Sequence, residues 1–263
     1  MKRLVFLHIP KTAGQTVHFE LERIFRKENV SPVRVHTQSP ETSFPDPERY
    51  LLFSGHIDWH DIERVPEPRV TFSVLRDPGE RVASFYFYLR SKARQLNPME
   101  LTLPTNRGLA LASELSADDY FCNPNLPERV FIDDHYDNFY THYFASRRIR
   151  GRSATSAMSP MQLIGKAIEN TKTLDLICMT DRLDLVERLI SDQFGHHVRL
   201  VDRFANRGPL EFSQSRYAAL MEEIKEKRSV ERIKELCHLD QILLKELGFG
   251  SGRNHGGAAC PAS

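Results

Sequence analysis

The run from Lys11 to Thr16, Lys-Thr-Ala-Gly-Gln-Thr, carries groups suited to binding an anion. It lies between a β-prone stretch at 4–9 and apolar residues at helical spacing over 16–27. A loop in this position directs backbone N–H groups and the positive end of a helix toward an anion. The lysine adds a charge, the threonines add hydroxyl donors, and the glycine allows close backbone approach.

We therefore predict that an anionic group is bound by the whole run, Lys11, Thr12, Ala13, Gly14, Gln15 and Thr16. The alternative is an ordinary turn with an exposed lysine. The run is not a Walker A loop, because its lysine precedes its glycine and the other Walker glycine is missing.

Arg76 and Ser84 form a second candidate anion site. An apolar run at 70–75 ends at Arg76, and the serine follows two turns along a helix expected over 79–92. A guanidinium and a hydroxyl together can hold a phosphate. The alternative is that a buried Asp77–Arg81 pair organises the start of this helix.

His56 is the candidate general base. It follows Gly55 at the end of an apolar run at 50–53, and imidazole titrates near neutrality without special tuning. The ordinary alternative is a structural histidine. A metal pair with His60 is a further alternative, although no HExxH pattern accompanies it.

Alternating strands and helices must position these residues. We expect strands at 4–9, 50–53, 70–75 and 174–180, with a short strand or extended segment at 198–201. Helices are expected at 16–27, 79–92, 137–144, 161–171, 182–194, 213–227 and 229–247. This alternation predicts a parallel, helix-covered α/β sheet, in which ligands bind beyond the carboxyl ends of the strands. The three polar clusters should therefore share one edge.

The composition indicates a globular chain with no bulk attraction to nucleic acid or membrane. The 263 residues carry 36 Lys+Arg against 35 Asp+Glu, and 40% are hydrophobic. No apolar run approaches the length of a membrane span or of a signal-peptide core, so we expect a soluble, cytoplasmic protein without a transmembrane segment. The four cysteines show no CxxC pairing.

We expect one domain over 1–249 and a disordered tail over 250–263, which is rich in Gly, Ala and Ser. Within the domain, 91–165 is polar and variable, with loops and short helices over 91–130, and is a candidate segment for recognising an acceptor. Two local basic groups stand out, namely Arg90, Lys92 and Arg94, and Arg147, Arg148, Arg150 and Arg152.

At these motifs the chain resembles the carbohydrate sulfotransferases, in the branch of the heparan sulfate 2-O-sulfotransferases and their soluble bacterial relatives. Residues 6–16, Gly55-His56, and 75–84 with their Arg-to-Ser spacing of eight resemble the family's motifs in order. Weaker similarities are found in Asp-Asn-Phe-Tyr-Thr at 137–141, the turn at 179–184 and Leu239-Asp240.

The resemblance implies a P-loop NTPase-like, three-layer fold. It also implies transfer of a sulfuryl group from PAPS (3′-phosphoadenosine-5′-phosphosulfate) to a hydroxyl or amine, with PAP as product and no obligatory metal. By this resemblance Lys11 and its loop hold the 5′-phosphosulfate and His56 is the base. Arg76 and Ser84 would hold the 3′-phosphate, and Arg207 would add a contact.

The resemblance has limits. Gln15 stands where many relatives have Thr or Ser, and the membrane anchor of the animal Golgi enzymes is not found. A carbohydrate acceptor is expected, but its identity does not follow. Two alternatives remain, an ATP-dependent kinase with a P-loop-like site and a nucleotide-binding module without catalysis.

Overall fold

The computed structural model describes residues 1–35, 47–201 and 215–249. The chain forms two compact units. We call Met1–Arg76, His142–Asn206 and Leu243–Ser263 the first unit, and Asp77–Thr141 and Arg207–Ile242 the second unit. The predicted tail lies outside the described residues, and the single domain over 1–249 stays a prediction.

A four-stranded parallel sheet forms the centre of the first unit. The strands are β1 (Arg3–Leu7), β2 (Leu52–Gly55), β3 (Arg69–Leu75) and β4 (Leu176–Met179), in the order β2-β1-β3-β4. The predicted parallel α/β sheet is confirmed. Buried residues fill both faces of β1, the pattern expected of a strand in a sheet covered on both sides.

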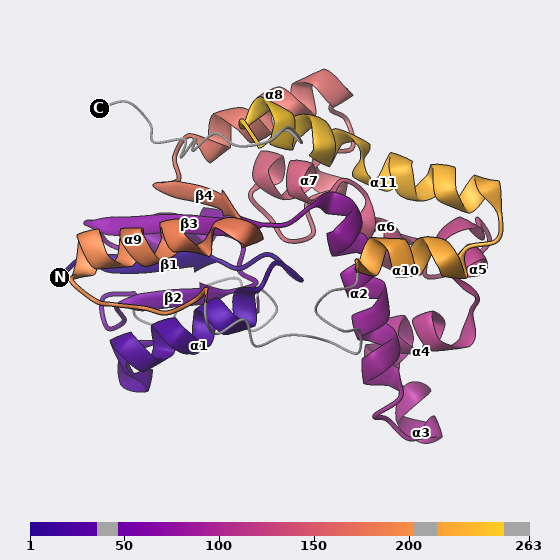
Figure 1. The fold of residues 1–263 in the computed structure, drawn as a ribbon, viewed down its shortest axis with the longest axis horizontal. Helices are drawn as coiled ribbons and strands as arrows, with labels where there is room; N and C mark the ends of the chain where they lie inside the picture. The colour runs from indigo at the N-terminus through magenta and orange to yellow at the C-terminus, as the bar shows by residue number, and fades with distance from the viewer. Residues whose placement is uncertain (36–46, 202–214, 250–263) are drawn as a thin grey trace. The chain divides into compact units, whose positions relative to one another are not determined.

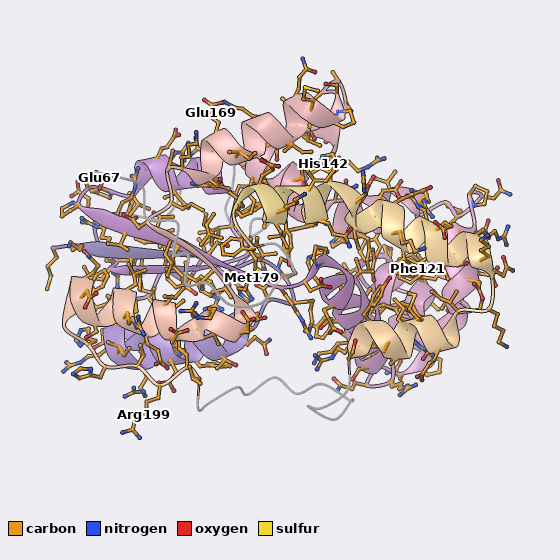
Figure 2. All side chains as sticks on the ribbon, turned by 45° about the horizontal axis from the view of Figure 1, so that its top comes forward. Glu67, Phe121, His142, Glu169, Met179 and Arg199 are labelled. Carbon is orange, nitrogen blue, oxygen red and sulfur yellow. The ribbon has the colours of Figure 1, made fainter. Side chains whose placement is uncertain are left out.

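The register brings the carboxyl ends of the strands to one edge. Leu7, the last residue of β1, pairs with Gly55 on one side and with Ser73 on the other. The Ser73 hydroxyl donates a hydrogen bond of 2.9 Å to the Leu7 carbonyl. Met179, at the carboxyl end of β4, marks this edge in Figure 2. The residues that directly follow β1, β2 and β3 therefore lie at the same edge of the sheet.

Helices cover the sheet. Helices α1 (Gly14–Phe25) and α9 (Leu183–Phe194) share one apolar core with it, and α8 (Pro160–Thr171) lies on the opposite side (Figures 1 and 2). Short 3-10 turns are η1 (Lys27–Asn29), η3 (Trp59–Arg64), η5 (Ser153–Thr155) and η6 (Thr180–Arg182). The segment 198–201 forms no strand with the described residues. No helix among the described residues has both the length and the apolar character needed to cross a membrane.

The second unit is helical. It contains α2 (Pro78–Ala93), α3 (Pro98–Leu101), η4 (Pro104–Asn106), α4 (Arg107–Glu114), α5 (Ala117–Cys122), α6 (Arg129–Tyr136) and α10 (Arg216–Glu223). The short helices expected within 91–130 are confirmed. Its core is rich in aromatic rings, including Tyr86, Tyr120 and Tyr136, and the Tyr120 hydroxyl donates to that of Tyr136 over 3.1 Å.

Helices α7 (Phe139–Ser146) and α11 (Lys227–Glu246) each run from the second unit into the first. Helix α7 begins two residues later than expected because Asn138, immediately before it, has a left-handed φ of 42°. A non-glycine residue with this φ cannot continue the right-handed helix. Asparagine tolerates the conformation better than most residues do.

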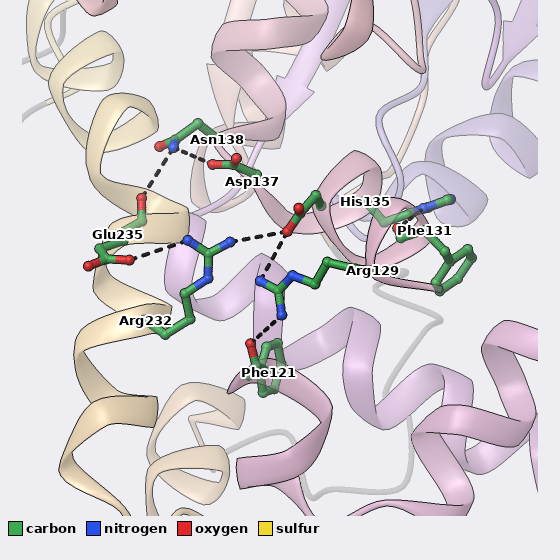
Figure 3. A network of polar contacts seen from close by, with 9 residues as sticks. Phe121, Arg129, Phe131, His135, Asp137, Asn138, Arg232 and Glu235 are labelled. Atoms are coloured by element: carbon green, nitrogen blue, oxygen red, sulfur yellow. Dashed lines mark hydrogen bonds and ion pairs between the residues drawn. The ribbon is translucent and has the colours of Figure 1, made fainter. Parts of the chain in front are cut away.

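Asn138 fastens the start of α7 to one turn of α11 (Figure 3). Its Oδ1 accepts from the N–H groups of Leu239 (2.7 Å) and Asp240 (3.3 Å). Its Nδ2 donates to the Glu235 carbonyl (3.2 Å), and its N–H donates to the Leu236 carbonyl (2.7 Å). These four groups would pair with each other in an uninterrupted helix. Asn138 therefore binds α11 through the backbone of a whole turn.

Asp240 completes this junction from the α11 side. Its carboxylate accepts from the N–H groups of Tyr140 and Thr141, at 3.1 and 2.8 Å, and from the Thr141 hydroxyl at 2.7 Å. Burial raises the pKa of this carboxyl to about 6, against the opposing effect of these hydrogen bonds. The otherwise unpaired N–H groups at the start of α7 are satisfied by this side chain.

The Asp77–Arg81 ion pair, considered as the alternative for this segment, is not found among the described residues. Asp77 caps α2 by accepting from the Glu80 N–H at 2.9 Å. Arg81, only 1% exposed, donates to the His135 carbonyl at 2.6 Å, and its guanidinium lies 4.1 Å from the centre of the Phe139 ring. A carbonyl and an aromatic face, rather than the aspartate, accompany this buried charge.

Replacing Asn138 should destabilise the second unit. Asn138→Gly removes the bonds to Glu235, Leu239 and Asp240 but tolerates the positive φ, so we expect a loss of about 1–3 kcal/mol in urea unfolding. Asn138→Ala should be less stable still, because alanine is strained at this φ. Asn138→Asp keeps the acceptor Oδ1 but puts a second acceptor in place of Nδ2, which donates to the Glu235 carbonyl (3.2 Å) and to Asp137 (2.8 Å), so it should be destabilised as well. Equal unfolding midpoints for all four proteins would contradict the role of Asn138.

Candidate functional site

The Lys11–Thr16 loop leads from the carboxyl end of β1 into α1. Lys11 and Ala13 both have left-handed φ values, 74° and 62°, which non-glycine residues adopt at a cost. Ala13 is the N-cap of α1, yet no side chain caps the helix there, and its first turn holds no acidic residue. The loop therefore combines the half-buried Lys11 with the uncapped, positive N-terminal end of α1, and these are the two features that an anion site requires.

The members of this loop have different surroundings. Thr12 is fully buried, and its hydroxyl donates to the Ile9 carbonyl at 2.9 Å, so this O–H closes the loop. The expected contact of Thr12 with a ligand stays a prediction. Gln15 is exposed on the first turn of α1, whereas Thr16 is buried there. The backbone of the loop is thus held from inside by one of its two threonines.

Gly14 is required by close packing against His8. A Cβ added to Gly14 would overlap Cδ2 and Nε2 of the His8 ring, far closer than real side chains approach. His8 directly follows β1 and is 6% exposed. The contact fixes the start of α1 against the end of the central strand, and any larger residue at position 14 would force them apart.

His56 lies beside this loop, at the end of the neighbouring strand β2. Its Nδ1 lies 2.6 Å from the His8 carbonyl oxygen. Because a carbonyl only accepts, Nδ1 carries the hydrogen, and in the neutral ring the lone pair is on Nε2. The half-buried ring is therefore held in the tautomer that a general base needs.

Gly55 makes room for this arrangement. The segment 30–35 runs parallel to β2, and a Cβ added to Gly55 would overlap the Arg34 carbonyl oxygen. That oxygen accepts from the His56 N–H at 2.8 Å. The Gly-His pair thus has a physical reason, because the small Gly55 leaves room for the segment 30–35, whose Arg34 carbonyl accepts from the His56 N–H.

Two buried histidines extend the site. Burial, followed by the charge of Arg34, lowers the pKa of His18 to about 4. His18 Nδ1 lies 2.9 Å from the Ser54 hydroxyl, and its ring nitrogens contact the Arg34 guanidinium. Burial also lowers the pKa of His8 well below its usual range. Both rings are neutral at pH 7, so Lys11 and Arg34 supply the fixed positive charge of this site.

The remaining predicted site residues are Arg76, Ser84 and Arg207. Arg76 follows β3 in the first unit and is half-buried. Ser84 is 6% exposed on α2 and belongs to the second unit, so its pairing with Arg76 stays a prediction. Arg207 lies outside the described residues.

The two basic groups are partly engaged within their own units. Arg90 pairs with Glu223 at 2.6 Å, and Arg147 pairs with Glu63 at 2.5 Å while lying over the Trp59 ring. Within the part of the chain that the structure describes, no group of three or more His, Cys, Asp or Glu side chains is arranged to hold a metal ion.

No family model matches the chain, and no curated protein matches it significantly.

The sequence pattern indicated His56 and the loop as candidates but did not indicate His8, His18 or Arg34, which the structure places beside them. His8 lies within the motif at 6–16, and its signal was its position directly after β1, three residues before Lys11. His18 lies one residue beyond the first turn of α1. Arg34 has no local signal, because its place follows from a parallel pairing with β2.

Gly14→Ala should destabilise the first unit by about 1–3 kcal/mol in urea unfolding, because the added methyl overlaps the His8 ring. Gly165→Ala is the matched control. Gly165 lies inside α8, and a Cβ added there would have no atom within 4 Å, so this change should stabilise by about 0.5–1 kcal/mol. The same sign for both variants would show that the Gly14 contact is not a tight one.

Proposed function

We propose that the protein is a PAPS-dependent sulfotransferase with a P-loop-like fold, which transfers a sulfuryl group to a hydroxyl or amine of a carbohydrate acceptor. The proposal rests on one observation above all. An anion loop and a histidine of fixed tautomer follow adjacent parallel strands, β1 and β2, and are joined through His8. This combination serves transfer of an anionic group to a nucleophile that must lose a proton.

His56 would act on the acceptor. Its Nε2 takes the proton of the acceptor hydroxyl as the oxygen forms a bond to the sulfur of PAPS. The bond between that sulfur and the bridging oxygen of the 5′-phosphate breaks at the same time, and its electron pair stays on that oxygen. The products are the sulfated acceptor, PAP and a protonated His56, which returns its proton to solvent.

Lys11 and the N–H groups at the start of α1 would stabilise the leaving group. Negative charge grows on the phosphate oxygen as the bond to sulfur breaks, and fixed donors aimed at developing charge are an efficient means of catalysis. Orienting the acceptor oxygen in line with the leaving oxygen supplies the rest, as in phosphoryl transfer.

Arg76, Ser84 and Arg207 would bind the 3′-phosphate. A guanidinium forms strong, charge-assisted hydrogen bonds to phosphate. ATP lacks a 3′-phosphate, so these contacts would select PAPS and PAP over ATP. The half-buried position of Arg76, directly after β3, supports its part in this assignment.

Calorimetry with PAP, PAPS and Mg·ATP tests the nucleotide assignment. We expect PAP and PAPS to bind and ATP to bind much more weakly. Transfer of labelled sulfate from PAPS to a panel of oligosaccharides then tests the reaction. Tight ATP binding without PAP binding would favour a kinase, whereas PAP binding without transfer to any acceptor would favour a module without catalysis.

His56→Ala should remove most turnover while PAP affinity stays close to that of the wild type, because the base acts on the acceptor. General bases contribute about 10²–10⁴-fold to rates. His60→Ala is the control, since His60 is exposed and contacts Asp61. Undiminished turnover in His56→Ala would show that another group takes the proton.

Arg76→Ala should weaken PAP binding by about 1.5–3 kcal/mol, which is roughly 10- to 150-fold in Kd. The exposed Arg199, labelled in Figure 2, provides the matched Arg199→Ala control, which should bind PAP normally. An unchanged affinity in Arg76→Ala would place the 3′-phosphate elsewhere.

A further inference from the structure

His8 touches both halves of the candidate site. Its ring is packed against Gly14 of the anion loop, and its centre lies 4.1 Å from the centre of the His56 ring. The ring also stacks on Phe6, at 5.4 Å with an interplanar angle of 12°. A single buried side chain therefore separates the loop from the candidate base.

We propose that His8 is a positioning residue, whose ring and carbonyl together set the place and the tautomer of His56 relative to the Lys11–Thr16 loop. This inference rests on the proposed function, in which His56 takes the acceptor proton. It adds a residue with no direct part in the chemistry.

The carbonyl and the ring act on different properties of His56. The carbonyl accepts from Nδ1 at 2.6 Å and so leaves the lone pair on Nε2. The ring, tilted by 38° against the His56 ring, limits how the imidazole can turn about its side-chain bonds. A base that turns away from the acceptor oxygen loses rate steeply, because proton transfer needs hydrogen-bond distance.

Packing holds the His8 ring. Its Nδ1 is buried and has no hydrogen-bond partner among the described residues, whereas Phe6, Gly14 and His56 all contact the ring. An aromatic ring of similar shape without nitrogens should therefore hold His56 almost as well. A branched aliphatic residue should not, because it lacks the flat face.

The neutral state of His8 is also consistent with this role. Burial is the main cause of its lowered pKa, and electrostatic interactions with His56, Arg34, His18 and Lys11 lower it further. A second imidazolium beside His56 would oppose protonation of the base through like-charge repulsion. Because His8 stays neutral, His56 is the histidine of this pair that takes the proton from the acceptor.

The test compares His8→Leu and His8→Phe with wild type, with His60→Ala as the control. Both variants replace the buried imidazole with an apolar side chain. Far-UV circular dichroism checks that each variant is folded. Sulfuryl transfer from PAPS is measured as kcat, KM for PAPS and the acid limb of the pH profile. Nitrogen-15 NMR of the imidazoles reports the tautomer of His56 without reference to activity.

In His8→Leu we expect kcat to fall about 10- to 100-fold, KM for PAPS to change far less, and the acid limb to move. An imidazole that turns loses its bond to the retained His8 carbonyl, so the His56 spectrum should then show a mixture of tautomers in place of a dominant Nδ1–H form. His8→Phe should lose less kcat than His8→Leu, because it keeps a flat ring beside His56 even though that larger ring crowds Gly14. His60→Ala should match wild type throughout.

The proposal would be overturned if His8→Leu kept the wild-type kcat, the wild-type acid limb of the pH profile and the wild-type tautomer of His56. An equal loss in His8→Phe and His8→Leu would also overturn it, since the nitrogens rather than the ring would then matter. If wild type transfers no sulfuryl group, the proposed function fails. The tautomer of His56 in the two variants still decides whether His8 positions it.

Discussion

The pairing of β1 on both of its edges is the constraint on which the first unit depends. Parallel neighbours place all strand ends at one edge, and β1 is paired to β2 and β3 through the same last residue, Leu7. The loop after β1, the histidine after β2 and the arginine after β3 are therefore brought to one edge by backbone hydrogen bonds. No side chain of the site has to create that proximity.

Two glycines refine what the sheet brings together. Gly14 lets the start of α1 approach the His8 ring, and Gly55 lets the Arg34 backbone approach β2. Each contact is so close that a methyl group would separate the partners. The loop, His8 and His56 consequently form one packed series, and Arg34 is brought beside them. Burial keeps His8 and His18 neutral, which confines the positive charge to a few groups.

The second unit depends on a different kind of constraint. Its aromatic core is packed around α2, but the junction of α7 and α11 is held by polar groups, with Asn138 bound to one turn of α11 and Asp240 bound to the start of α7. Hydrogen bonds specify direction and register more narrowly than apolar contacts do. Both helices continue into the first unit within a few residues of this junction.

The sequence by itself determined the alternation of strands and helices and the places where polar residues interrupt it. Apolar runs and helical spacing are local signals, so the four strands and the main helices lie close to their expected positions. His56 and the loop were predicted as site residues from their positions at strand ends, and both do follow strands. The short segment at 198–201 carried too little pattern to separate a strand from extended chain. The side chain of Asn138 explains the later start of α7, because its left-handed backbone depends on bonds to a helix a hundred residues away.

Only the tertiary structure decided which side chains meet. Three contacts depend on the fold and not on local spacing. The Thr12 hydroxyl closes its own loop, and Arg81 lies on an aromatic ring instead of pairing with Asp77. The His8 ring lies between Gly14 and His56. Arg34 reaches the site through a parallel pairing that leaves no periodic trace in the chain. The spacing of residues along the chain determines the helices and strands, whereas the site is made of contacts between them. The free energy of those contacts depends on burial, which a short stretch of sequence does not reveal.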